Sequence, residues 1–158
     1  AGILVQQGES KRALEYLDRV AEINPNFAVD MVRVKAQILQ SIERYDEALE
    51  QYDKAVSYRP DAEGLYLGRA ELLLRMDRVD EAIAQYRVAA KRWPNSAISL
   101  NALGYTLADR TDAYDEAEKL IKKAIKLNPE SAAIIDSWGW SINPVLSPSN
   151  CISAEIRP

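Results

Sequence analysis

The side chains that most often carry out catalysis or bind metals are scarce or dispersed in this sequence. Histidine, the commonest general base and metal ligand near neutral pH, is absent. The single cysteine, Cys151, has no second thiol for a zinc site or a disulfide and no histidine to activate it. The six glycines are spread along the chain and form no phosphate-binding loop. We therefore predict that the chain is not an enzyme and that it uses neither a metal nor a cofactor.

Carboxylates remain as candidates for acid–base chemistry, because an Asp-Glu pair recurs three times. The pairs are Asp46-Glu47, Asp80-Glu81 and Asp115-Glu116. Each pair is followed by an alanine and then by apolar residues at helical spacing. A pair in this place lies in the first turn of a helix, where its negative charge meets the positive end of the helix dipole. We favour this structural role over catalysis.

The elements that carry these pairs follow a repeat of alanines and prolines. An alanine lies twelve residues before each of four prolines: Ala13 and Pro25, Ala48 and Pro60, Ala82 and Pro94, Ala117 and Pro129. Successive prolines are 35, 34 and 35 residues apart. A small alanine lets a neighbouring helix approach closely, and a proline ends a helix because it has no N–H to donate. Four copies in register predict a tandem array of helix pairs.

Helix is the only secondary structure that the sequence predicts. Ala, Leu, Glu, Lys and Arg are common, whereas valine and isoleucine never alternate with polar residues over the length of a strand. We expect an all-α protein with about eight helices. Their predicted ranges are 10–23, 29–42, 46–58, 62–76, 80–92, 96–109, 115–127 and 131–141.

The period and the small-residue steps at Leu103-Gly104 and Trp138-Gly139 resemble the tetratricopeptide-repeat (TPR) family over roughly residues 1 to 140. The resemblance implies an α-solenoid, in which antiparallel helix pairs stack into a right-handed superhelix. Residues 1–142 then form a TPR array of one partial repeat, three full repeats and a half repeat. Residues 143–158 contain internal prolines and continue no repeat, so we interpret them as a non-repeat tail.

In this family, ligands are bound mostly by the first helix of each pair, which lines the concave face. The resemblance therefore implies a partner-binding site on that face. The site residues taken from matching positions are Arg33, Gln37, Glu71, Asn101, Tyr105, Asp136 and Trp140, with Arg75 beside them. Their mixture of charged, amide and aromatic groups suits a peptide with polar and apolar side chains, so the chain is expected to be a scaffold or adaptor for protein binding. The tyrosines that recur in the second helices, Tyr16, Tyr52, Tyr58 and Tyr86, are predicted to pack in the core.

A narrower resemblance concerns residues 101–109 and 135–140, which look like a stretch of proteobacterial TPR lipoproteins. One such lipoprotein is an outer-membrane adaptor of a carboxyl-terminal processing protease. The resemblance implies a bacterial parent protein in the periplasm or attached to the outer membrane, with a periplasmic protease as partner. The alternative is a self-assembly module that stacks end to end through exposed terminal helices, with weak homodimerisation through Ile134, Ile135 and Trp138.

Charge and hydropathy set further limits on the partner. The formal net charge of −4 gives no basic face for nucleic acid, and no apolar run is long enough to insert in a membrane. Four lysines recur on one second helix, at positions 119, 122, 123 and 126. We interpret this stripe as a solvated outer face, with a phosphate or anionic-lipid contact as the alternative.

Overall fold

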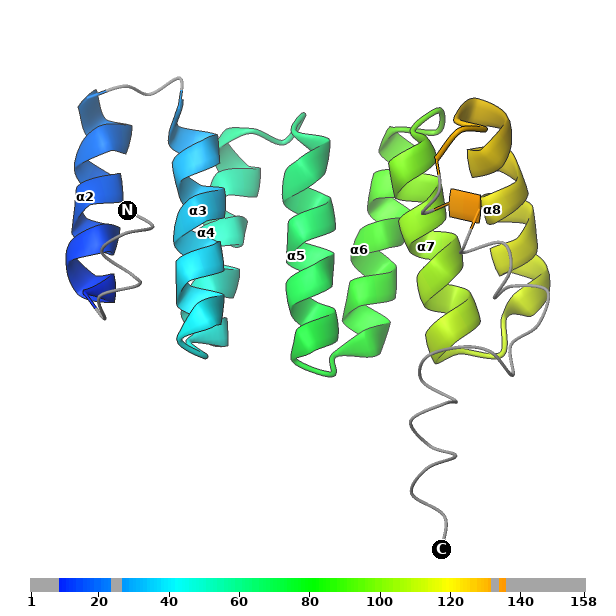
Figure 1. Cartoon of the computed structure of the whole chain (residues 1–158), viewed down its shortest axis with the longest axis horizontal. Helices are drawn as coiled ribbons and strands as arrows, with labels where there is room; N and C mark the ends of the chain where they lie inside the picture. The colour runs from blue at the N-terminus through cyan, green and yellow to red at the C-terminus, as the bar shows by residue number, and fades with distance from the viewer. Residues whose placement is uncertain (1–8, 24–26, 132–133, 136–158) are drawn as a thin grey trace, which may run out of the picture. The chain divides into compact units, whose positions relative to one another are not determined.

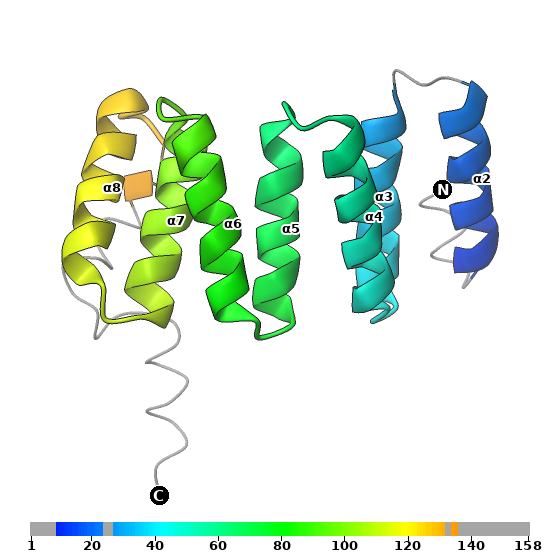
Figure 2. The ribbon, with the colours of Figure 1, turned by 180° about the vertical axis from the view of Figure 1, so that it is seen from behind.

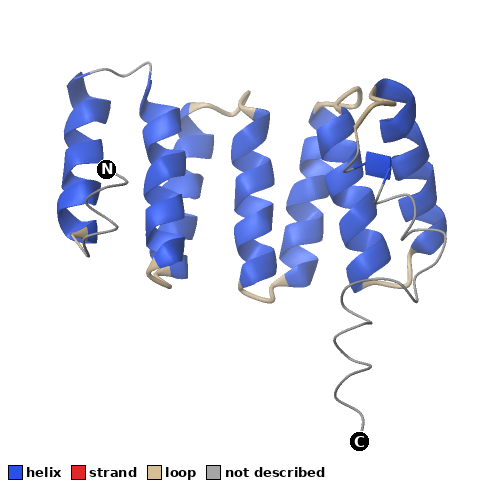
Figure 3. Ribbon diagram, viewed as in Figure 1, coloured by secondary structure: helices blue, strands red, loops and turns tan. Residues whose placement is uncertain are grey.

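Helices account for nearly all of the described chain. The computed structural model describes residues 9–23, 27–131 and 134–135, and Figure 3 shows helices joined by short turns, with no strand in those residues. The helices are α2 (Ser10–Ile23), α3 (Ala28–Ser41), α4 (Tyr45–Tyr58), α5 (Glu63–Arg75), α6 (Val79–Arg92), α7 (Ala97–Arg110) and α8 (Tyr114–Leu127). Seven of the predicted ranges are thus confirmed to within one residue at each end. The predicted helix at 131–141 and the tail at 143–158 lie mostly or wholly outside the described residues.

The chain divides into two compact units, and the first comprises residues 1–78 with helices α2 to α5. Within it, α3 and α5 lie on one side and α4 on the other (Figures 1 and 2). The core between these helices contains Ala36, Leu39, Ala48, Tyr52, Ala55, Leu65 and Leu72. Ala36 and Ala48 are completely buried, so the small side chains bring α3 and α4 close together, as the repeat pattern predicts.

The second unit comprises residues 79–158 and contains α6, α7 and α8. Its core brings together Leu100, Ile121, Ala124 and Ile134. Gly104 of α7 lies against α8 so closely that an added Cβ would be 2.7 Å from Ile121 Cγ1 and 3.1 Å from the Ala117 carbonyl oxygen. The glycine step therefore admits the neighbouring helix, as the sequence predicts. The all-α class and the paired helices of an α-solenoid are confirmed.

The burial of Ile134 corrects one expectation about self-association. Ile134 is only 3% exposed, because it packs against Leu100 and Ile121 inside the second unit. Its side chain is therefore not available to a second copy of the chain, and this part of the predicted dimer contact is wrong. Ile135 is 49% exposed, and Trp138 lies outside the described residues.

The turns that follow α3 and α5 have the same backbone structure. Glu43 and Asp77 adopt left-handed conformations, with φ of 61° and 58°. The N–H of Arg44 donates to the Leu39 carbonyl, and the N–H of Arg78 donates to the Leu73 carbonyl. These bonds are typical of a Schellman motif, which closes the end of a helix and redirects the chain. The turn after α7 differs, because Thr111 is extended and its hydroxyl donates to the Leu107 carbonyl.

Candidate functional site

The predicted site residues of the first unit lie on the first helices α3 and α5. Arg33 and Gln37 are one turn apart on α3, and Glu71 and Arg75 are one turn apart on α5. Residues four apart share one face of a helix, so each pair forms a short stripe. All four side chains are exposed, whereas the neighbouring Ala36 and Ala70 are completely buried in the packing.

Tyr52 of α4 also lies close to α5. Its side chain is 3% exposed, and its ring lies against Gly68 of α5. An added Cβ on Gly68 would be 2.7 Å from the Tyr52 Oη and 2.9 Å from the ring carbons Cε1 and Cζ. The absence of a side chain at position 68 is therefore what lets the tyrosine pass beside α5.

The polar surroundings of the Tyr52 hydroxyl connect the predicted site residues. Burial raises the pKa of Tyr52 above its ordinary value of 10, and the negative charge of Glu71 adds to this rise. Arg33 and a side-chain hydrogen bond with Gln40 lower the pKa and partly oppose the rise. Arg33, Gln40 and Glu71, from two helices, thus act on one hydroxyl group.

The predicted core packing is confirmed for Tyr52 and Tyr86, each 3% exposed. It is wrong for Tyr16 and Tyr58, which are 55% and 80% exposed.

The predicted site residues of the second unit are Asn101 and Tyr105, one turn apart on α7. Both are partly buried. The Oδ1 atom of Asn101 is buried and has no hydrogen-bond partner. Burial raises the pKa of Tyr105, mainly because the charged phenolate would lose its hydration, with Asp109 adding to the rise and Arg110 opposing it. Asn101 therefore holds a hydrogen-bond acceptor that the fold leaves unused.

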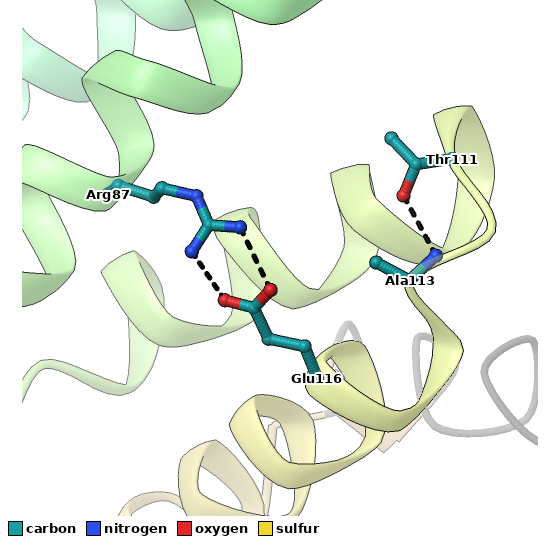
Figure 4. A network of polar contacts seen from close by, with 4 residues as sticks. All are labelled: Arg87, Thr111, Ala113 and Glu116. Atoms are coloured by element: carbon teal, nitrogen blue, oxygen red, sulfur yellow. Dashed lines mark hydrogen bonds and ion pairs between the residues drawn. The ribbon is translucent and has the colours of Figure 1, made fainter.

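The second helices of this unit, α6 and α8, are joined by a partly exposed ion pair. Arg87 of α6 donates two hydrogen bonds to Glu116 of α8, with lengths of 2.5 and 2.8 Å (Figure 4). This bidentate bond raises the pKa of Arg87 and lowers that of Glu116. Glu116 belongs to one of the Asp-Glu pairs of the sequence, and its contact is structural. Nearby, Lys122 pairs with Glu118 on the exposed surface of α8.

Several expected features lie outside the described residues or find no counterpart within them. Asp136 and Trp140, the predicted site residues of the last repeat, are outside the described part of the chain. In the described part, no group of three or more acidic, histidine or cysteine side chains could hold a metal ion. No helix there is both long and apolar enough to cross a membrane.

Comparison with known sequences identifies the repeat. Residues 33–97 match one description of the tetratricopeptide repeat, and residues 1–27 and 97–131 match another. These matches together cover most of the chain. The chain belongs to the tetratricopeptide-repeat family. The predicted resemblance to the TPR family is therefore confirmed.

One TPR relative is a repeat-containing protein of Pseudomonas aeruginosa. It is 34% identical over 138 residues, which cover 87% of this chain but only 23% of the relative. The present chain thus spans less than a quarter of that protein.

Solved TPR structures share the fold at low sequence identity. MamA from Desulfovibrio magneticus RS-1 has a TM-score of 0.67 at 19% identity, covering 98% of this chain and 85% of MamA. The first TPR of Spaghetti (RPAP3), bound to an HSP90 peptide, has a TM-score of 0.64 at 18% identity, covering 75% of this chain and 94% of the other. YrrB, described as a TPR protein with an unusual peptide-binding site, has a TM-score of 0.63 at 18% identity, covering 96% of this chain and 77% of YrrB.

Proposed function

We propose that this TPR chain is a protein-interaction scaffold that binds a peptide segment of a partner protein on its first helices. In the first unit the binding residues are Arg33, Gln37, Glu71 and Arg75. In the second unit they are Asn101 and Tyr105. Asp136 and Trp140 extend the proposed site by sequence position alone.

The observation that carries this proposal is the pair of exposed polar stripes on α3 and α5, beside the completely buried Ala36 and Ala70. On α7, the partly buried Asn101 adds a side-chain amide whose NH₂ group can donate a hydrogen bond to a peptide C=O. Tyr105, one turn away, adds an aromatic surface with a polar end.

Two fold relatives support the choice of a peptide over a small molecule. The solved structure of the Spaghetti TPR contains a peptide, and the YrrB structure is described by its peptide-binding site. The exposed polar residues on α3 and α5 are spread along two helices, which favours an elongated ligand.

The partner that we propose for the parent protein is a periplasmic protease of the carboxyl-terminal processing class. The likeness of residues 101–109 and 135–140 to proteobacterial TPR lipoproteins supports this adaptor role, together with a periplasmic or outer-membrane-attached location. The similarity to a Pseudomonas aeruginosa sequence supports a bacterial origin.

Peptide binding can be tested with peptides selected from a random heptapeptide display library against the purified chain. Replacing Asn101 by leucine or Tyr105 by alanine is expected to weaken a selected peptide by about 1–3 kcal/mol. Helix content measured by circular dichroism should stay unchanged. The matched control replaces Lys122 and Lys123 on the outer surface of α8, and this change should alter only the salt dependence. Binding that depends on these lysines and not on Asn101 or Tyr105 would contradict the proposed face.

The identity of the partner needs a separate experiment. A purified carboxyl-terminal processing protease with its nucleophile replaced is titrated with the full-length parent protein, and the complex is measured by calorimetry. We expect binding that the Tyr105→Ala change weakens. A protease that binds the parent and the variant equally well would place its contact elsewhere, and an absence of heat and of complex would refute this partner.

A further inference from the structure

A small hollow lies beside the proposed peptide site in the first unit, between the beginning of α3 and the beginning of α5. Its volume is about 60 Å³, and it is lined by Asp30, Arg33, Ala62, Gly64 and Leu65. Leu65 is 2% exposed and Ala62 is partly buried, so these two residues give the hollow an apolar surface. Asp30 and Arg33 are exposed and carry the charges at its edge.

The two charged residues at the edge are available to a ligand. Arg33 Nη2 lies 3.4 Å from Asp30 Oδ1, and both side chains are 57% exposed. An ion pair so long and so exposed contributes little to stability, so a ligand can replace it at low cost. Asp30 offers acceptors and Arg33 offers donors. A residue of an extended peptide presents the complementary groups, one backbone N–H and one C=O.

The size of the hollow selects among peptide side chains. A cavity needs roughly 10–15 Å³ to hold one water molecule. The hollow of about 60 Å³ is therefore large enough for roughly four to six water molecules. Valine, leucine, isoleucine and proline each have three or four side-chain carbons and are comparable in size. Phenylalanine and tryptophan are larger than the hollow, and glycine and alanine leave most of it empty.

Gly64 lines the hollow and has no side chain to fill the space beside it. An added Cβ at this position has no atom within 4 Å, in contrast to Gly68 four residues later, where it would collide with Tyr52. Close packing therefore explains the glycine at 68 and does not explain the one at 64. A side chain at position 64 would occupy space that borders the hollow and leave the core untouched.

We propose that this hollow is a specificity pocket for one branched apolar side chain of the bound peptide. Ala62 and Leu65 contact that side chain, Asp30 accepts a hydrogen bond from its backbone N–H, and Arg33 donates one to its backbone C=O. The pocket rests on the proposed function, because it selects one residue of the peptide that the scaffold binds. It gives a role in recognition to Asp30 and Gly64, which were not predicted as site residues from the sequence.

The experiment compares peptides selected from the same random heptapeptide library by the unchanged chain and by two variants. Gly64→Leu fills the space beside the hollow, and Gly64→Ala adds one methyl group. Both variants should fold, because no atom is near the added Cβ and both residues favour helix more than glycine does. Thermal unfolding followed by circular dichroism checks this. The matched control is Lys122→Leu, which adds the same side chain on the outer surface of α8.

The unchanged chain and the control should enrich one peptide position for valine, isoleucine, leucine or proline. Gly64→Leu should lose that enrichment and bind the selected peptide at least tenfold more weakly, with Gly64→Ala in between. Replacing the enriched residue by glycine should weaken binding to the unchanged chain and have little effect on binding to Gly64→Leu. Asp30→Asn should weaken binding severalfold without changing which side chain is preferred.

Two results would overturn the pocket and leave the scaffold function standing. One is a selected peptide that binds Gly64→Leu as tightly as it binds the unchanged chain. The other is an enriched position that prefers an aromatic or acidic residue and is sensitive to Gly64→Leu. If the unchanged chain enriches no peptide at all, both the proposed function and the pocket fail.

Discussion

Adding a single methyl group at Gly104 is expected to destabilise the folded chain. Its added Cβ would meet Ile121 Cγ1 at 2.7 Å and the Ala117 carbonyl at 3.1 Å, and the second of these belongs to the backbone of a packed helix. We expect Gly104→Ala to lower the free energy of unfolding by about 1–3 kcal/mol, as measured by urea denaturation. The control is Gly64→Ala at the second residue of α5, which should leave the free energy of unfolding unchanged or raise it slightly, because alanine favours helix and meets no neighbour there. Equal effects at the two glycines would contradict this account of the packing.

Tyr52 should make the stability of the chain sensitive to alkaline pH. Its pKa is raised above 10 in the folded protein, mainly by burial, so the unfolded chain releases this proton first as the pH rises. The stability that Tyr52 contributes is therefore complete below pH 10 and declines as the pH rises above it. Urea denaturation at several pH values between 8 and 11 should show a shallower decline for Tyr52→Phe. Parallel curves for the two proteins would show that this hydroxyl does not carry the effect.

For individual site residues, the sequence predicted the helix that carries each residue and its exposure, because both follow from the position in the repeat. Arg33, Gln37, Glu71 and Arg75 are exposed on first helices, as their positions predict. Two properties depend on distances between helices and have no local signal in the sequence. One is the approach of the Tyr52 hydroxyl to Gln40 through the gap at Gly68, and the other is the hollow beside Gly64. For the contact between Tyr52 and Gln40, the sequence signal was a tyrosine, rather than a phenylalanine, at a core position.

Helices, in contrast to sites, were predictable because the signals for their ends are local. An acidic pair begins a helix and a proline follows its end, and both effects act within a turn or two of the chain. The agreement is close even for α7, which begins at Ala97 after Ser96, whose side chain accepts a hydrogen bond from the Ser99 N–H. Side-chain pairs that connect neighbouring helices could not be predicted, because such contacts depend on the angle at which the helices pack.

The contact between α6 and α8 is one such pair. Glu116 has a lowered pKa because Arg87 donates two hydrogen bonds to it, so the stabilisation is present above the ordinary value of 4.5 and is lost as the pH falls below it. A double-mutant cycle with Arg87→Gln and Glu116→Gln should give a coupling of about 0.2–1 kcal/mol at pH 7, since both side chains are about half exposed.

The coupling should shrink toward zero at pH 3 and should also decrease in 1 M salt, where exposed charges are screened. The pair of Lys122 and Glu118, which lies within one helix, provides the comparison and should couple by no more than about 0.5 kcal/mol. A coupling that is the same at pH 3 and pH 7 would mean that it does not arise from the charged form of Glu116.

At the scale of the whole chain, most contacts join helices that are neighbours in sequence. In the first unit α2 contacts α3, α3 contacts α4, and α4 contacts α5, with a smaller contact between α3 and α5. In the second unit α6 contacts α7, and α7 contacts α8 most extensively. In the part of the chain that the structure describes, buried side chains form several separate clusters, so stability is distributed among local interfaces.

Damage to one interface should therefore remain local. Gly104→Ala weakens the packing of α7 on α8, and we expect faster hydrogen exchange of the amides in those two helices. The amides of α3 and α4 should exchange at their original rates, because the substitution touches none of their contacts. Exchange measured by mass spectrometry on peptic fragments can test this. A uniform increase along the whole chain would instead indicate one cooperative unfolding unit.

The matching turns after α3 and α5 bear on how such a gene can change. Each turn is followed by an arginine that begins a similar segment. The two segments are Arg44-Tyr45-Asp46-Glu47-Ala48 and Arg78-Val79-Asp80-Glu81-Ala82. Recombination between the two coding segments would delete or duplicate 34 residues and join Glu43 to Arg78, or Asp77 to Arg44. Either junction places an acidic residue with the same left-handed backbone before an arginine. Unequal crossing-over at this point can thus change the length of the array by one repeat while every turn keeps its hydrogen bonds.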